Sequence, residues 1–272
     1  MTDRSRGAIC IAVLGLGLVP GRASQKASSS SSATPAHPVS AAVVELLAVG
    51  PGSRGQNQEC SATGFLINED GYILTNAHVV EKARECLAKA PGARIVAKFA
   101  RPASPEAGAT GRSEAAAPSV SCELVSVDEV HDLAVMKTER PVRAGQGDAS
   151  PYAALEASEV APATPVKVTG HPAFAWDSVT QSGHVFGRKT LALSQRSKQP
   201  SGVLVLDIQL KSGNSGSPVY LEAGGGVVGV VEGQDPHNSA VTVAVPIREA
   251  IDFLDRLGVR WHAAPKQGGA PL

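Results

Sequence analysis

The sequence predicts an all-β fold of two packed antiparallel β-barrels with a short C-terminal helix. From about residue 41, short apolar runs recur between turn-forming Gly, Pro, Asn and Asp residues. Aromatic residues make up only 4% of the 272 residues, whereas Gly, Ala, Val and Pro are abundant, which favours strands and turns over a helical bundle. A helical apolar period occurs only near the end of the chain.

Two segments precede the predicted folded region. Arg4 and Arg6 are followed by an apolar run at 8–19 and then by small residues up to Ala23, which is typical of an export signal cleaved after Ala23. An uncleaved anchor is the alternative, although the run is short for a membrane span. Residues 24–40 are rich in Ser and Pro and predict a disordered linker. We therefore expect an exported protein, periplasmic or secreted, with no stable membrane span after removal of the signal 1–23.

One folded region is predicted over 41–258, with the first barrel at about 41–140. Thr63–Ile67 and Tyr72–Thr75 flank the turn residues Asn68–Gly71, which indicates a hairpin. An insert at about 101–119, rich in Ala, Pro, Gly and Ser, predicts a surface loop. Further strands are expected at 94–99 and 122–127.

The second barrel is predicted at about 150–258, after a connection rich in Pro and Gly at 140–152. Ile247, Ile251, Leu254 and Leu257 share one face of a helix, and Gly258 is a suitable stop. The residues that follow, 259–272, predict a flexible tail. Strands are expected at 164–169, 178–183, 202–206, 226–231 and 240–245.

Three segments carry residues suited to acyl transfer. Ser215 lies between Gly213 and Gly216, where a tight turn presents a hydroxyl beside free backbone N–H groups, although such a turn by itself is common. A serine needs a base, which His78 supplies, and a carboxylate to orient that base, which Asp132 supplies. The order His, Asp, Ser is one of the known triad orders. Backbone N–H groups of Gly213 and Ser215 would form the oxyanion hole.

These segments resemble the trypsin-like (chymotrypsin-fold) serine proteases, most closely the HtrA/Deg type. The resemblance implies a double β-barrel with the catalytic site in the cleft between its halves. It also favours Asp132 over the nearby Asp128, because Leu133–Val135 follows Asp132 as the family's buried strand does. The resemblance covers about 41–258 and rests on residues 64–80, 131–135, 178–183, 206–216 and 244–247.

The resemblance also implies the walls of the primary substrate pocket. No Asp lies at the expected pocket base, which predicts a preference for small or medium aliphatic residues before the scissile bond. Glu232 departs from the family's usual small or uncharged residue, and either favours basic substrates or points into solvent. The walls are expected to be formed by Ile208, Gln209 and Leu210 on one side and by Val231, Glu232, Gly233 and Gln234 on the other.

Two further positions depart from related proteases. Asn214 stands where digestive proteases carry an aspartate that pairs with a newly cut N-terminus, so activation by that salt bridge is not available. Ser217 stands where the family usually has a second glycine, which alters the turn behind Ser215. HtrA-type relatives commonly carry a C-terminal PDZ domain, whereas only about 14 residues follow Gly258, so we expect none here.

Cysteines Cys60, Cys86 and Cys122 remain after signal cleavage, an odd number for an oxidising compartment. One disulfide plus one free thiol is the simplest arrangement. A Cys60–Cys86 disulfide would brace the loop that carries His78, and Cys86–Cys122 is the second pairing. Three buried reduced thiols are the remaining alternative.

The sequence therefore predicts a serine endopeptidase that hydrolyses unfolded or damaged proteins through a covalent acyl-enzyme. The alternative is a protease-fold chaperone whose triad is misaligned. Polypeptides are the expected partners, and the zero net charge gives no reason to expect nucleic acid binding. We expect no cofactor and no metal, because the histidines have no metal-binding spacing. His131, His171 and His184 are predicted to be structural or exposed.

Overall fold

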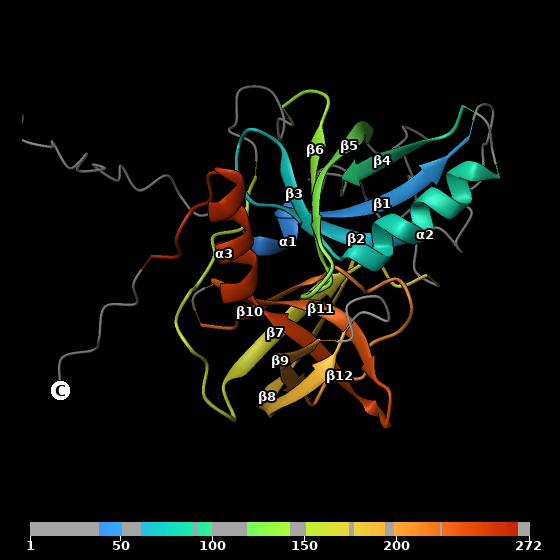
Figure 1. Ribbon diagram of the computed structural model, residues 1–272. Coiled ribbons are helices and arrows are strands. Elements are labelled where there is room, and N and C mark those ends of the chain that lie inside the picture. Colours follow the sequence, from blue (N-terminus) through green and yellow to red (C-terminus); the bar gives the residue numbers. More distant parts are fainter. Residues whose placement is uncertain are drawn as a thin grey trace, which may run out of the picture. The chain divides into compact units, whose positions relative to one another are not determined.

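The computed structural model describes residues 38–50, 61–89, 92–99, 119–141, 151–173, 177–193, 199–223 and 225–265 (Figure 1). The predicted signal segment, the predicted linker up to residue 37, most of the 101–119 insert and Cys60 lie outside the described residues. Within the described ranges, no helix has the length and apolar character needed to cross a membrane.

The first barrel is built from the first half of the chain, as the sequence predicts. Its strands close in the order β1-β2-β3-β6-β5-β4. The predicted hairpin joins β2 to β3, with Phe65 opposite Leu74, and the Asn68 side chain accepts the N–H groups of Asp70 and Tyr72 in its turn. The elements are α1 (Val39–Ala42), β1 (Val43–Val49), β2 (Ser61–Leu66), β3 (Tyr72–Thr75), α2 (Ala77–Ala88), β4 (Arg94–Phe99), β5 (Ser119–Asp128) and β6 (Leu133–Thr138).

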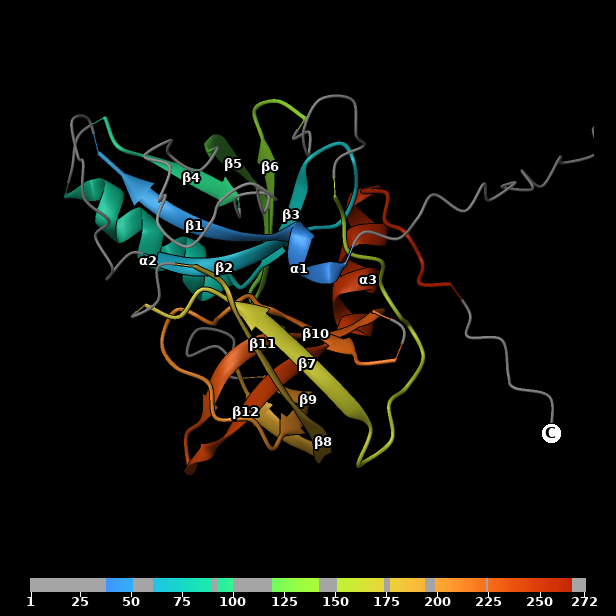
Figure 2. The same cartoon turned by 180° about the vertical axis from the view of Figure 1, so that it is seen from behind.

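The second barrel repeats this arrangement in the second half of the chain. Its strands close in the order β10-β11-β12-β9-β8-β7, and all neighbouring pairs are antiparallel. Figure 2 shows the two barrels from behind, with β7 running along the second one. The predicted fold class is therefore confirmed. The strands are β7 (Pro165–Gly170), β8 (Val179–Ala192), β9 (Pro200–Leu206), β10 (Pro218–Leu221), β11 (Val227–Asp235) and β12 (Asn238–Pro246).

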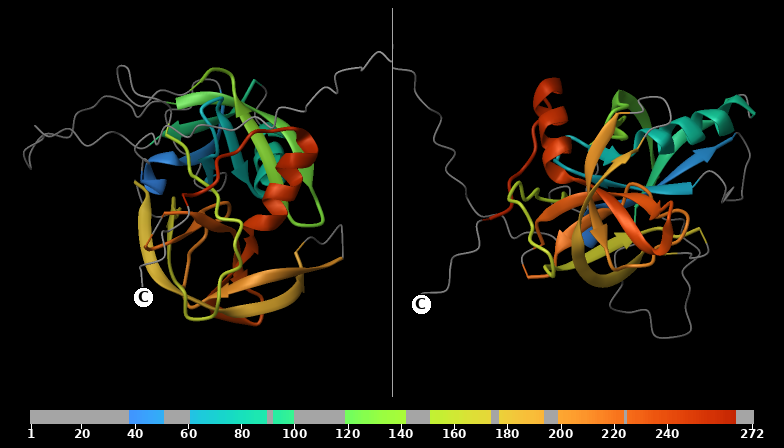
Figure 3. Two further views of the ribbon diagram at one scale, coloured as in Figure 1. Left: turned by 90° about the vertical axis from the view of Figure 1, so that its left-hand side faces the viewer. Right: turned by 60° about the horizontal axis from the view of Figure 1, so that its bottom comes forward.

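Helix α3 (Ile247–Leu257) follows the last strand and packs against the first barrel (Figure 3). Its buried residues Ile251, Phe253 and Leu254 belong to the same hydrophobic cluster as Phe65 and Leu74 of the first barrel. Gly258 ends the helix with φ +66°, the left-handed conformation that glycine adopts readily. The helix therefore ties the end of the second barrel to the first.

The residues after α3 differ from the flexible tail that the sequence predicts from 259. Asn68 donates to the carbonyl of Arg260, the ring of His262 stacks on Tyr152 with centroids 4.0 Å apart, and Ala263 forms a β-bridge with Leu155. These contacts hold residues 259–265 on the surface of the barrels. Their partners are distant in sequence, so no local pattern in the Pro- and Gly-rich tail indicates them.

Candidate active site

His78 lies in the first turn of α2, directly after β3. Asn76 is the N-cap residue in an extended conformation, and it is fully buried between the strand and the helix. The helix begins here because the chain leaves β3 at Thr75 and the following Ala-rich segment has good helix propensity. The His78 side chain keeps 41% of its surface exposed, so its ring is accessible from outside.

Asp132 binds His78 from the turn between β5 and β6. One carboxylate oxygen accepts the backbone N–H of His78 at 2.9 Å, and the other lies 2.6 Å from the ring Nδ1. The Asp132 carbonyl in turn accepts the Asn76 side chain at 3.0 Å and the Ala77 N–H at 3.2 Å. Asp132 has φ +53°, a conformation that few residues other than Gly, Asn and Asp adopt. The Asp132 side chain is buried, and hydrogen bonds to both its carboxylate and its backbone carbonyl fix its position.

The pKa of His78 reflects two opposing effects. Burial of the imidazole lowers its pKa, whereas the hydrogen bond and the negative charge of Asp132, with a further contribution from Glu232, raise it; the result is a pKa above the ordinary value. Lys82 on the same helix opposes this increase. The imidazolium form is therefore stabilised by its carboxylate neighbours.

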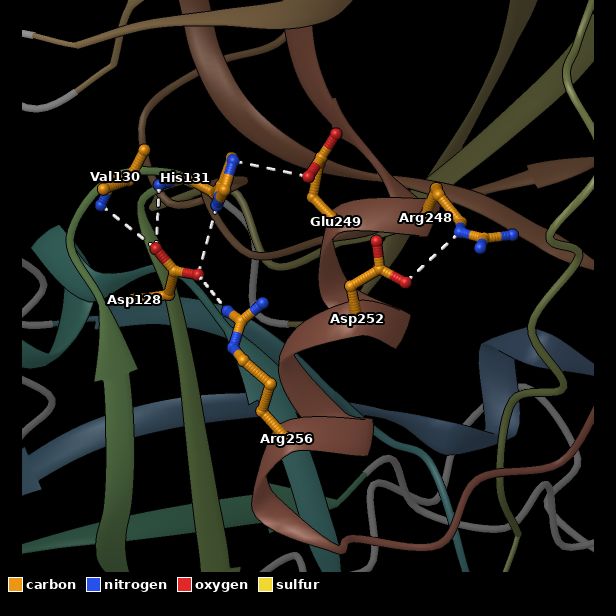
Figure 4. A network of polar contacts seen from close by, with 7 residues as sticks. All are labelled: Asp128, Val130, His131, Arg248, Glu249, Asp252 and Arg256. Carbon is orange, nitrogen blue, oxygen red and sulfur yellow. Dashed lines mark hydrogen bonds and ion pairs between the residues drawn. The ribbon is translucent and has the colours of Figure 1, made fainter.

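Asp128, the other candidate carboxylate in the sequence, contacts different residues. Its carboxylate accepts the N–H groups of Val130 and His131, the ring Nδ1 of His131 at 3.1 Å and a guanidinium N–H of Arg256 at 2.7 Å (Figure 4). The other ring nitrogen of His131 lies 3.3 Å from Glu249, so α3 contacts this turn twice. Asp128 and His131 thus connect the turn that carries Asp132 to α3, which agrees with the structural role expected for His131.

Ser215 lies on a turn that leads into β10. Gly213 and Gly216 both have positive φ, +97° and +85°. A Cβ at Gly213 would overlap the carbonyl of His171 and lie 2.8 Å from the backbone nitrogen of Ala173, so no larger residue fits. Thr63 on β2 binds this turn from the first barrel: its N–H donates to the Ser215 carbonyl at 3.0 Å and its hydroxyl to the Gly213 carbonyl at 2.8 Å. The turn is therefore held by both barrels.

The backbone around Ser215 leaves two donors free. Gly216 donates to Val231, and Asn214 donates to Lys211 through both its backbone and its side chain. In the part of the chain that the structure describes, the N–H groups of Gly213 and Ser215 have no hydrogen-bond acceptor. An oxyanion hole requires unpaired backbone donors of this kind.

The Ser215 hydroxyl and the His78 ring line the same cavity, together with Gly213 and Lys82. In the structure the hydroxyl donates to the backbone carbonyl of Glu232 at 2.9 Å rather than to the imidazole. Catalytic hydrogen bonds are often long or absent without substrate. Rotation about the Cα–Cβ bond of Ser215 redirects its hydroxyl without movement of the backbone.

The predicted pocket residues fall into two groups. Ile208, Leu210 and Val231 are buried in the core of the second barrel, whereas Gln209 and Gln234 are exposed. The Gln234 side chain donates to the Leu210 carbonyl at 3.0 Å and so joins the two predicted walls. Gly233 lies on β11 beside Glu232, opposite Val243 of β12.

Glu232 is half-buried and does not simply point into solvent, whereas a preference for basic substrates stays a prediction. Its carboxylate turns inward, and one oxygen of Glu232, one oxygen of Asp132 and one ring nitrogen of His78 lie within 4.8 Å of one another. Burial, followed by the negative charge of Asp132, raises the pKa of Glu232 to about 7, against the opposing effect of His78. The sequence singles out Glu232 as a departure, but it does not reveal the direction of the side chain.

A histidine with two carboxylates is also a common metal-binding set. Two ligands that each lie about 2 Å from a zinc ion are about 3.3 Å apart in tetrahedral geometry, whereas the His78 nitrogen and the Asp132 oxygen are only 2.6 Å apart. The spacing fits a hydrogen bond that holds a proton and does not fit two ligands of one metal.

The remaining residues singled out from the sequence lie around this site. His184 is exposed and bonds Asp207, whereas His171 is buried next to the Ser215 turn. Cys122 is buried and free, which excludes the Cys86–Cys122 pairing. Cys60–Cys86 stays a prediction, because Cys60 is outside the described residues. Ser217 is fully buried, and its hydroxyl has no hydrogen-bond partner.

Known proteins resemble the chain in both sequence and fold. It is 29% identical over 218 residues to a probable periplasmic serine endoprotease, DegP-like, of Halomonas elongata, and 28% identical over 207 residues to a protein of the same description from Hahella chejuensis. These matches cover 76% and 74% of the chain but only 37% and 36% of the relatives' length.

Among solved structures, the active form of the Rv3671c protease of M. tuberculosis matches with a TM-score of 0.59 at 17% identity, over 83% of this chain and 85% of that one. An HtrA-type protease with a tripeptide matches with a TM-score of 0.57 at 18% identity, over 81% and 61% of the two chains. At these identities the likeness concerns the fold. The family model described as a trypsin-like peptidase domain matches residues 62–230, and with this match the chain belongs to the trypsin-like peptidase family.

Proposed function

We propose that this protein is a serine endopeptidase in which Ser215 is the nucleophile, His78 the general base and acid, and Asp132 the residue that orients His78. The observation that carries the proposal is the double contact of Asp132 with His78 beside a cavity that Ser215 also lines. A carboxylate that binds Nδ1 leaves Nε2 free to accept a proton from the nucleophile.

The proposed reaction has two halves. Ser215 Oγ attacks the peptide carbonyl carbon while its proton passes to His78 Nε2, and the oxyanion binds the free N–H groups of Gly213 and Ser215. His78 then gives the proton to the leaving amine as the C–N bond breaks, which leaves an acyl-enzyme. Water repeats these steps, and the acid is released with Ser215 restored.

The proposed substrates are unfolded or damaged polypeptides. The relatives are described as periplasmic serine endoproteases, which supports polypeptide substrates and an exported location. The predicted walls include the apolar residues Ile208, Leu210 and Val231 and contain no Asp, and their one acidic residue, Glu232, lies near His78. We therefore propose cleavage after small or medium aliphatic residues, which a peptide panel tests: faster cleavage after Arg or Lys than after Val, Ala or Leu contradicts it.

The test of the catalytic assignment uses the mature protein with a fluorophosphonate probe and with unfolded casein. We expect labelling and hydrolysis in the wild type and in Ser158→Ala, an exposed serine of the same half of the chain, and neither in Ser215→Ala. Casein binding without labelling or hydrolysis in the wild type would favour the chaperone alternative, for which the Ser215–Glu232 hydrogen bond is the supporting observation. Labelling that persists in Ser215→Ala contradicts the choice of nucleophile.

A further inference from the structure

Two carboxylates approach the imidazole of His78 from different parts of the fold. Asp132 comes from the turn before β6 in the first barrel, and Glu232 comes from β11 in the second barrel. Asp132 binds Nδ1 directly, whereas Glu232 reaches within 4.8 Å of both partners. The triad proposed above includes Asp132 as its only carboxylate and assigns no role to Glu232.

We infer that Glu232 is a second carboxylate for His78, a positioning residue that acts through the imidazole and not on the substrate. This inference rests on the function proposed above. When ionised, Glu232 adds a second negative charge beside the ring, which favours the imidazolium that forms as Ser215 gives up its proton. No proton is transferred to or from Glu232 in this step, and the proton moves only between Ser215, His78 and the leaving amine.

Glu232 is half-buried, and its carboxylate lies near His78 and Asp132 rather than free on the surface. Partial burial of a carboxyl without a compensating partner costs free energy in its charged form. The groups that face it in the described structure are His78 from α2, Asp132 from the turn before β6 and the Ser215 hydroxyl on its own backbone carbonyl. Lys82, on α2, acts on His78. His78 is therefore the one neighbour whose positive form favours the ionised Glu232.

The backbone of Glu232 strengthens the link to the nucleophile. Its carbonyl holds the Ser215 hydroxyl at 2.9 Å, and its carboxylate lies near the base that must receive the same proton. β11 pairs with β12 at Val231 and at Gly233, and the register shifts between these two residues, so Glu232 lies at an irregularity of the strand that is paired on both sides. One residue of the second barrel thus contacts the nucleophile and approaches the base, which belongs to the first.

The charge of Glu232 and the charge of His78 are coupled. An ionised Glu232 raises the pKa of His78, and a protonated His78 lowers the pKa of Glu232. The pKa of Glu232 is raised to about 7 and the pKa of His78 lies above its ordinary value, and the charge of each group affects the titration of the other. The acidic limb of the pH profile for kcat/KM is then the property of the pair and not of His78 alone.

The test compares the wild type, Glu232→Gln and Glu232→Asp, with Glu222→Gln as the control. Glu222 is an exposed carboxylate of the second barrel that pairs with Lys167, far from the proposed machinery. The same Glu→Gln change there alters the net charge equally. Peptide hydrolysis gives kcat/KM and kcat against pH, and an NMR titration in the Ser215→Ala background gives the pKa of His78 without any need for activity.

In Glu232→Gln we expect the pKa of His78 and the acidic limb of kcat/KM to move to lower pH by about half a unit or more. This is the effect of removing one unit charge within 4.8 Å of the imidazole, even with the dielectric constant of water. We expect kcat on the alkaline plateau to fall about threefold with KM little changed. The reason is that a change of half a unit in the pKa of His78 corresponds to about a threefold loss in the stability of the imidazolium. Glu232→Asp should keep part of the shift, and Glu222→Gln should match the wild type.

Superimposable pH profiles and an unchanged pKa of His78 in Glu232→Gln overturn the inference. Thermal melts of each variant show whether it is folded. If Glu232→Gln does not fold, the pH profile of kcat/KM and the pKa of His78 are compared between Glu232→Asp and the wild type instead. A protein without hydrolytic activity contradicts the proposed function, whereas the NMR titration still reports whether Glu232 acts on His78. The two failures are therefore distinguishable.

Discussion

The carboxylate of Asp132 binds His78 twice, at the backbone N–H and at the ring Nδ1. The exposed pair of Asp207 and His184 has the same double contact, with a ring distance of 3.2 Å. The two pairs differ in burial, since the Asp132 side chain is 4% exposed and that of Asp207 is 45% exposed. Burial strengthens the electrostatic part of the first pair.

Asp132→Asn should abolish most activity and leave the fold intact. An amide cannot accept both N–H groups and hold the imidazole in the tautomer that keeps Nε2 free, and this loss is worth about 10⁴-fold in kcat for such triads. Peptide hydrolysis and circular dichroism check this expectation. Asp207→Asn makes the same chemical change in the exposed pair and should retain activity; equal losses in both variants would contradict the role of Asp132.

Asp128→Asn should destabilise the fold at neutral pH. Although burial by itself raises the pKa of Asp128, the hydrogen bonds and charge of His131 and the charge of Arg256 lower it below the ordinary value of 3.8. A carboxyl with a lowered pKa stabilises the folded state above its unfolded pKa, and this stability disappears as the pH falls through the folded pKa.

We expect Asp128→Asn to cost about 1–3 kcal/mol at pH 6 and much less below about pH 3. Urea unfolding at several pH values measures the difference. Asp252→Asn, which changes a carboxylate on the exposed side of α3, is the control, since its pair with Arg248 lies on the surface. A difference for Asp128→Asn that does not depend on pH would contradict the explanation.

Gly213→Ala should be more destabilising than Gly258→Ala. Both residues have positive φ, so a Cβ costs about 1 kcal/mol at either position. At Gly258 no atom lies within 4 Å of the new Cβ, whereas at Gly213 it would overlap the His171 carbonyl. Thermal unfolding should separate the two variants, and only Gly213→Ala should reduce hydrolysis. Equal melting temperatures would show that the Ser215 turn adapts.

Ser217→Ala should stabilise the protein by about 1 kcal/mol. A buried hydroxyl without a partner costs about 1–3 kcal/mol, and alanine removes it at the cost of a small volume. Thr169→Val is the contrasting variant, because the Thr169 hydroxyl is buried and bonds both Thr180 and Tyr220. Chemical denaturation should show opposite signs for the two changes; destabilisation by Ser217→Ala would indicate a partner such as a bound water.

A disulfide between Cys60 and Cys86 should be found in the exported protein. Cys122 is buried and its thiol pKa is raised to about 12, mainly by burial, so it is a poor partner for thiol exchange. Peptide mapping by mass spectrometry without reduction should recover the 60–86 link and an unmodified Cys122. Alkylation of Cys86 in the native, unreduced protein would contradict the pairing.

Much of the fold follows from local sequence patterns. The turn at Asn68–Gly71, the apolar strands on either side and the helix that ends at Gly258 each carry their own signal, and the structure has all three. Four elements were not singled out: α1, which begins inside the predicted linker 24–40, β1, β10 and the full length of α2. β10 has only four residues, and the apolar residues of both β1 and β10 are explained by the barrels that these strands close. The second half of β8 alternates between exposed and partly buried residues and gives little apolar signal.

The sequence by itself determined the double-barrel class and the three residue types at His78, Asp132 and Ser215, because strand patterns and short motifs are local. The tertiary structure decided how Asp132, which the resemblance favours over Asp128, meets the imidazole: its carboxylate lies 2.6 Å from Nδ1 of His78, whereas Asp128 binds His131 and Arg256. It also decided the direction of Glu232. A residue at a register shift of a strand points inward or outward according to what packs against it, and here the packing brings Glu232 within reach of a histidine 154 positions earlier in the chain.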